Sequence, residues 1–170
     1  MKIDNIKIKL PRTKQSLDKV FLNCEKRKKL IADTFEHYKQ HLKKAKHDFS
    51  RADAEFKDEC WDWTIIKAYY SIHHVGNALM SKKKGVFSKD HSCLIVALNH
   101  FKLIPSDLFL ELINLHENFS EILSLDLTFQ LRKISQYSVD EWEDLTKKDA
   151  KLVLDIAKKL IIFVEGEIWN

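Results

Sequence analysis

The stretch WDWTIIKAYYSIHHVGNALM, residues 61–80, decides the fold of this chain. On a helix that turns by about 100° per residue, apolar and aromatic side chains cover most of its circumference. A helix this apolar packs against several neighbours rather than one. We therefore predict that residues 61–82 form the central helix of a bundle. The narrow stripe predicted to face water consists of Thr64, Lys67, Ser71, His74 and Ala78.

The composition favours a single all-α domain. A chain of 170 residues corresponds to about one domain. Its three glycines and two prolines leave few turns, so the elements should be long and helical. We predict five main helices and no strand beyond the first ten residues, which alternate between apolar and polar side chains like an extended arm.

The helix boundaries are predicted from periodicity and end signals. Apolar residues at steps of three, four and seven, with no Gly or Pro between them, predict one amphipathic helix over residues 30–59. Gly85, preceded by lysines that suit the negative end of a helix, should end the central helix. The other three main helices are predicted around residues 91–104, 106–123 and 146–166, and a short helix around 17–24. The predicted N-caps are either Ser88 or Asp90, Ser106 and Thr146 for the main helices and Ser16 for the short one.

The sequence shows no targeting signal, no membrane-spanning segment and no cysteine motif. No apolar run reaches the length of a membrane span, and residues 1–14 lack the apolar core of a signal peptide. A cytoplasmic protein without membrane contact is therefore expected. Because Cys24, Cys60 and Cys93 are widely spaced and odd in number, reduced thiols are expected.

The positive charge is concentrated in the N-terminal third. Residues 1–58 hold 16 Lys/Arg and 9 Asp/Glu, a net +7, whereas the rest holds 13 and 16, a net −3. Such a segment favours a polyanion or an acidic protein as a partner, or is simply a solvated lysine-rich helix, which is the commoner case.

Two pairs of histidines could carry chemistry. His37 and His41 are four residues apart, the spacing of paired metal ligands on a helix, but no third ligand is signalled. We therefore predict solvated surface histidines and no metal site. His73 and His74 are adjacent on the central helix, so one of them must face inward or toward a cleft. The default is a buried, hydrogen-bonded histidine; the alternative is a site residue.

The sequence lacks cofactor-binding loops but contains a notable arginine, Arg132, in its C-terminal third. The chain has no GxGxxG, P-loop or GxSxG motif, so no nucleotide cofactor is expected. Arg132 lies between Leu131 and Ile134 in a short predicted helix, five residues before Tyr137. A partly buried arginine needs a carboxylate or a phosphate partner. An internal salt bridge with an acidic residue of 141–144 and an anion site both satisfy that need.

The stretch AYYSIHHVGNALMSKKKGVFSKDHSCLIVAL, residues 68–98, resembles the core of the HEPN superfamily. The resemblance covers about residues 40–165 and includes an R-x4-[HY] element, here Arg132 to Tyr137. It implies an up-and-down bundle of four to five long helices over residues 28–170, with residues 1–27 as an N-terminal arm and short helix outside it. The positions that carry the core pattern are Ala68, Tyr69, Tyr70, His73, Ala78, Leu79, Gly85 and His91.

The resemblance implies a homodimer that belongs to a toxin–antitoxin, defence or CRISPR-type system. A nucleotidyltransferase antitoxin is the partner that such systems often contain. In active members, the R-x4-6-H residues of two protomers cleave RNA without a metal by attack of the 2′-hydroxyl on the adjacent phosphate. Here Tyr137 stands in the place of the histidine, and a phenol that titrates near 10 is a poor base at neutral pH.

Three functions follow for this chain. The first is a dimeric module that binds RNA or a nucleotide together with the nucleotidyltransferase-type partner, with Tyr70, His73, His74 and His91 lining a cleft. The second is a metal-independent endoribonuclease in which Arg132 and Tyr137 are catalytic and one of the histidines supplies the base. The third is a helical scaffold that docks an acidic protein through its basic N-terminal helix.

Overall fold

The computed structural model of the chain describes residues 9–119 and 144–169. Over those residues the chain forms six helices and a sheet of two short strands, so the all-α class is confirmed. None of the described helices is long and apolar enough to cross a membrane. The elements are α1 (Lys14–Lys26), β1 (Leu30–Ala32), α2 (Tyr38–Lys57), α3 (Trp61–Lys84), β2 (Val86–Ser88), α4 (His91–His100), α5 (Ser106–Phe119) and α7 (Lys147–Trp169).

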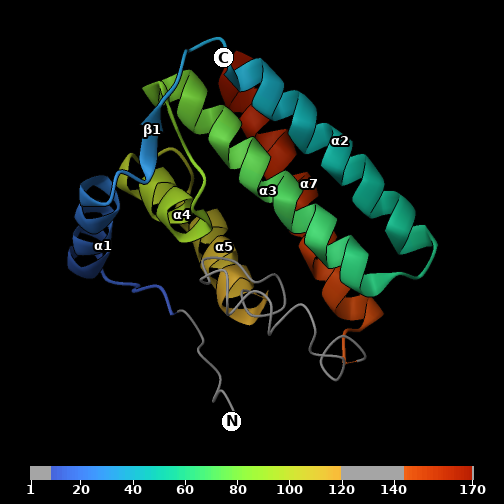
Figure 1. Cartoon of the computed structure of the whole chain (residues 1–170). Coiled ribbons are helices and arrows are strands. Elements are labelled where there is room, and N and C mark those ends of the chain that lie inside the picture. The colour runs from blue at the N-terminus through green and yellow to red at the C-terminus, as the bar shows by residue number, and fades with distance from the viewer. Residues whose placement is uncertain (1–8, 120–143, 170) are drawn as a thin grey trace.

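The central position of α3 is confirmed. Helix α3 contacts α2, α7 and α4, and Figure 1 shows it beside α2 with α7 behind the pair. Ile65, Val75, Leu79 and Met80 are completely buried in the core. Helix α3 ends at Gly85, which adopts the left-handed conformation (φ 64°) expected of a C-terminal glycine.

The predicted water-facing stripe of α3 is wrong for three of its five residues. Thr64, Ser71 and Ala78 are completely buried. Ser71 Oγ donates a hydrogen bond of 2.8 Å to the main-chain carbonyl of Ala45 on α2. A small hydroxyl that bonds to backbone loses its need for water, so it can lie where two helices approach closely.

The helix predicted over residues 30–59 begins only at Tyr38. Residues 30–32 instead form β1, which pairs antiparallel with β2 in the register Leu30↔Ser88 and Ala32↔Val86. The prediction of no strand beyond residue ten is therefore wrong as well. The apolar spacing that predicts a helix continues through β1, and the pairing partner lies more than 50 residues away in sequence, so local periodicity could not separate the two states.

The helix caps follow the sequence closely at two places. Of the two candidates before α4, Asp90 is the cap: its carboxylate accepts a hydrogen bond of 3.0 Å from the main-chain N–H three residues on. Before α7, the N–H of Thr146 donates to Asp149 Oδ2 and the N–H of Asp149 donates to Thr146 Oγ1, which is a capping box. The other two predicted caps lie just inside their helices, since α1 starts before Ser16 and α5 starts at Ser106.

The prediction of reduced thiols is wrong for two of the three cysteines. Cys24 on α1 and Cys93 on α4 form a disulfide, and Cys60 is free. The 69 residues between the paired cysteines give no local signal of their pairing. Phe21 stacks on His100 with 3.8 Å between ring centroids, so α1 is also joined to α4 by a non-covalent contact.

Candidate functional site

The four predicted cleft residues lie together where α3 meets α4. We call Tyr70, His73, His74 and His91 the histidine cluster. The rings of His73 and His91 stack with 3.9 Å between centroids. The ring of His74 lies 5.8 Å from that of His73, and the ring of Tyr70 lies 6.0 Å from that of His91. His73 and His91 are buried, whereas Tyr70 is 43% exposed, so the cluster runs from the core to the surface.

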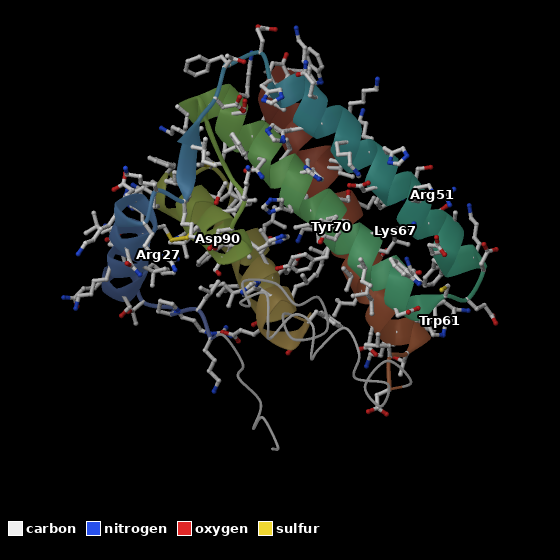
Figure 2. The ribbon with its side chains drawn as sticks, viewed as in Figure 1. Arg27, Arg51, Trp61, Lys67, Tyr70 and Asp90 are labelled. Carbon is white, nitrogen blue, oxygen red and sulfur yellow. A yellow bond between two sulfur atoms is a disulfide. The ribbon has the colours of Figure 1, made fainter. Side chains whose placement is uncertain are left out.

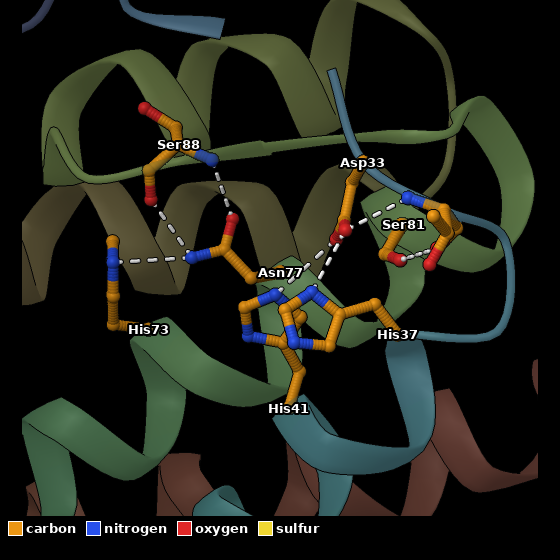
Figure 3. A network of polar contacts seen from close by, with 8 residues as sticks. Asp33, His37, His41, His73, Asn77, Ser81 and Ser88 are labelled. Atoms are coloured by element: carbon orange, nitrogen blue, oxygen red, sulfur yellow. Dashed lines mark hydrogen bonds and ion pairs between the residues drawn. The ribbon is translucent and has the colours of Figure 1, made fainter. Parts of the chain in front are cut away.

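Asn77 fixes the orientation of His73 and its tautomer. The Asn77 amide donates to the carbonyl of Ser88 and accepts from the Ser88 N–H, both at 2.8 Å, as Figure 3 shows. Its nitrogen also lies 3.1 Å from His73 Nε2. Because an amide nitrogen only donates, Nε2 must accept, and neutral His73 carries its proton on Nδ1.

The histidines of the cluster on α3 are held neutral. Burial, together with the neighbouring His91 and His74, keeps the pKa of His73 well below its ordinary value. Burial also lowers the pKa of His74, although Asp48, 3.8 Å away, acts in the opposite direction. At neutral pH these rings therefore offer hydrogen-bonding groups but no positive charge to an approaching anion.

A second tyrosine–histidine pair lies in the core next to the histidine cluster. Tyr69 Oη lies 2.7 Å from His116 Nδ1 of α5, and both residues are buried. A narrow pocket beneath His73 and His91 has mostly apolar walls, so it belongs to the core. The sequence marks Tyr69 only through the family pattern, and nothing in it pairs His116 with this site.

A row of aromatic and basic side chains leads from the cluster along α3, with two exposed rings and two partly exposed side chains. Trp63, Lys67, Tyr70 and His74 recur at steps of four, three and four, so they share one helix face, and we call them the α3 stripe. Trp63 is 51% exposed, and Lys67 Nζ lies 5.8 Å from the centre of its ring. In Figure 2, Lys67 and Tyr70 follow one another along α3. Exposed rings alternating with a cation can stack on bases and attract phosphates.

Basic residues also lie beside the start of α4. Arg27 Nη2 is 3.8 Å and Lys29 Nζ is 3.5 Å from Asp90 Oδ2. Figure 2 shows Arg27 and Asp90 close together on the side of α1. Asp90 caps α4 directly before His91, so two cations lie beside one carboxylate at the edge of the histidine cluster. We call Arg27 and Lys29 the basic rim.

The prediction that His37 and His41 are solvated is wrong for His41. The side chain of His41 is only 13% exposed, and its Nε2 lies 3.5 Å from Asp33 Oδ2. Burial lowers the pKa of His41, although Asp33 acts in the opposite direction. Asp33 is the third potential ligand that the histidine spacing did not reveal, because it lies on the connection between β1 and α2 rather than on the helix.

The two predicted catalytic residues, Arg132 and Tyr137, lie outside the described residues. The described part of the candidate site is therefore the histidine cluster, the α3 stripe and the basic rim. The catalytic roles of Arg132 and Tyr137 stay predictions.

These features define an all-α bundle domain whose central helix carries Tyr70, His73 and His74 at one polar edge. The HEPN domain family model matches residues 38–167, which is most of the chain. The chain therefore belongs to the HEPN domain family, as the core pattern of residues 68–98 suggests. Comparison with curated proteins gave no match.

Proposed function

We propose that this chain is a dimeric HEPN module of a toxin–antitoxin or defence system that binds single-stranded RNA or a nucleotide, together with a nucleotidyltransferase-type partner. The observation that carries the proposal is the α3 stripe, which leads from exposed Trp63 past Lys67 and Tyr70 to the histidine cluster. The cytoplasmic location, the homodimer and the partner protein rest on the sequence and on the family.

The chemistry of the stripe suits nucleotides better than a simple anion. Two large rings are exposed next to a lysine, and stacking on aromatic rings is tolerant of base identity. His73 and His74 are neutral, so affinity for phosphate must come from Lys67, which also pairs with Glu55 at 3.2 Å, from the basic rim and from Arg132. We therefore expect binding that depends on both bases and salt.

Binding of a fluorescently labelled single-stranded oligoribonucleotide, followed by anisotropy at several salt concentrations, tests the proposal. Tyr70→Ala should weaken binding roughly five- to 150-fold, the cost of about 1–3 kcal/mol per lost base stack. Trp169→Ala is the matched control, because Trp169 is an exposed ring at the far end of α7.

The outcomes separate the possible functions. Competition by a mononucleotide as effective as that by the oligonucleotide identifies a nucleotide site, whereas weak competition identifies RNA. No binding at low salt, or equal affinity of wild type and Tyr70→Ala, contradicts the proposal. Binding of an acidic protein without RNA would instead support the scaffold function.

The second candidate is the metal-independent endoribonuclease. Its base would remove the proton of the 2′-hydroxyl, whose oxygen attacks the phosphorus; the 5′-oxygen leaves and takes up a proton, and a 2′,3′-cyclic phosphate remains. His73 is poorly suited as that base, because Nε2 accepts from Asn77 and Nδ1 already carries the proton. His74 is a better candidate, because its side chain is partly exposed and its lowered pKa leaves it neutral.

Growth on expression tests the nuclease. If the chain is a toxin, growth should arrest, Arg132→Ala should restore it, and purified protein should cleave RNA in the presence of a chelator. Normal growth with wild-type protein and intact RNA contradict this candidate and leave the binding module.

A further inference from the structure

Three potential metal ligands converge where the chain enters α2. Asp33 follows β1, His37 directly precedes α2 and His41 lies in its first turn. One ligand atom from each residue can be chosen so that all three lie within 4.8 Å of one another. His37 Nδ1 is 2.8 Å from Asp33 Oδ1, and His41 Nε2 is 3.5 Å from Asp33 Oδ2; both contacts are drawn in Figure 3.

The backbone holds Asp33 firmly in this position. The N–H of Asp33 donates to the carbonyl of Gly85 at 2.8 Å, next to the paired strands β1 and β2. The N–H of Thr34 donates to Asp33 Oδ1 at 2.8 Å, and Ser81 Oγ of α3 donates to the carbonyl of Thr34 at 3.1 Å. One hydrogen bond therefore orients the carboxylate and two others hold the backbone on either side of it before any ligand arrives, which favours a site of defined geometry.

Two atoms at this point are buried without a hydrogen bond. The side chain of Asp33 is only 6% exposed. Within the described residues, Asp33 Oδ2 and His41 Nε2 face each other at 3.5 Å but neither makes a hydrogen bond, and both atoms are out of reach of solvent. A buried carboxylate oxygen without a partner is costly, and native structures rarely keep one. A cation between the two atoms would satisfy both.

We propose that Asp33, His37 and His41 bind a divalent transition-metal ion, with Zn²⁺ as the best fit. Two imidazole nitrogens and one carboxylate oxygen form the ligand set that zinc accepts, whereas Mg²⁺ and Ca²⁺ require mostly oxygen. The fourth position lies on the side of His37, whose side chain is 47% exposed. Ligand atoms of a tetrahedral zinc lie about 3.3 Å apart, so His37 must withdraw slightly from Asp33, which its exposure permits.

The site would fasten the β1–α2 connection at the C-terminal end of α3. It would also adjoin the histidine cluster, since the ring of His41 lies 6.2 Å from that of His74. The metal site does not depend on the proposed RNA binding, because none of its three ligands is a residue of the α3 stripe or Arg132.

Titration of tag-free protein with Zn²⁺ against a chromophoric chelator tests the site, and Co²⁺ serves as the spectroscopic probe. Wild type should bind one equivalent of Zn²⁺, show the visible absorption of tetrahedral Co²⁺ and melt at a higher temperature with Zn²⁺ present. His37→Ala and Asp33→Asn should lose all three effects. His47→Ala should keep them, because His47 is an exposed histidine of the same helix outside the ligand set.

The proposal is overturned if wild type binds no Zn²⁺, or if His37→Ala retains the one-equivalent site with unchanged affinity. His37→Ala keeps the test decisive even if Asp33→Asn fails to fold, since His37 is half exposed and lies outside the core. Loss of the Co²⁺ absorption in His47→Ala as well as in His37→Ala would identify adventitious binding to surface histidines and would equally overturn it.

Discussion

The side-chain amide of Asn77 joins His73 to the backbone of Ser88: it lies 3.1 Å from His73 Nε2 and forms two hydrogen bonds of 2.8 Å with the Ser88 main chain. One side chain of α3 thereby fixes both the tautomer of a site histidine and the last residue of β2.

Replacing Asn77 should therefore weaken the fold as well as the site. Asn77→Ala leaves the Ser88 N–H and carbonyl without partners, and each unsatisfied buried group costs about 1–3 kcal/mol. We expect this loss in the free energy of unfolding measured with urea. Asn118→Ala is the control, because Asn118 is exposed on α5. A wild-type midpoint for Asn77→Ala would contradict the assigned hydrogen bonds.

Stability should fall on mild acidification because of His73. Its pKa is lowered in the folded state by burial and lies near 6.5 when unfolded, so below about pH 6.5 only the unfolded chain takes up this proton. The loss is at most about 1.4 kcal/mol per pH unit for one proton, and it ends once pH drops below the folded pKa. Urea unfolding at several pH values should show a smaller slope for His73→Gln; equal slopes would argue against a neutral, buried His73.

The disulfide should contribute measurably to stability. Reduction, or replacement of Cys93 by serine, opens a bridge that closes a 69-residue separation, and we expect a loss of about 2–4 kcal/mol. Thiol titration in denaturant should find one reactive cysteine before reduction and three after it. Cys60→Ser should leave the stability near that of wild type, and three thiols in the unreduced protein would contradict the bridge.

Two helical glycines should respond in opposite directions. A Cβ on Gly76 would lie 3.1 Å from Leu94 Cδ2 and 3.3 Å from Leu98 Cδ1, so Gly76→Val should overpack the α3–α4 contact and cost about 1–3 kcal/mol. Apart from the backbone of α7 itself, no atom of the described residues lies within 4 Å of a Cβ built on Gly166, so Gly166→Ala should stabilise by about 0.5–1 kcal/mol. Thermal unfolding of both variants checks the pair, and shifts of the same sign would contradict it.

Periodicity and end signals predicted what local chemistry determines. Apolar side chains around most of the circumference of residues 61–80 place α3 at the centre of the bundle. Gly85 ends α3, and the capping box of Thr146 and Asp149 starts α7. Most of the errors involve partners distant in sequence, although His41 contacts Asp33 only eight residues before it. Residues 30–32 need β2 to become a strand, and Ser71 needs the carbonyl of Ala45 to be stable in the core.

Some residues of the candidate sites could be predicted from the sequence and others could not. The family pattern marked Tyr70, His73 and His91, and the structure brings their rings together; their role in a functional cleft stays a prediction. The position of Asp33 beside His37 and His41 could not be read from the histidine spacing, because Asp33 lies on the connection between β1 and α2 and not on the helix.

The pairing of β1 with β2 has a consequence for where the domain can be cut. The family match begins at residue 38, yet the partner of β2 lies before that point, and so does the cysteine bonded to Cys93. A fragment that starts at residue 38 would lose the backbone partner of β2 and uncover the face of α4 that Phe21 covers. The segment that identifies the family is therefore shorter than the segment joined by the disulfide and the strand pairing, and fragments for expression should retain α1.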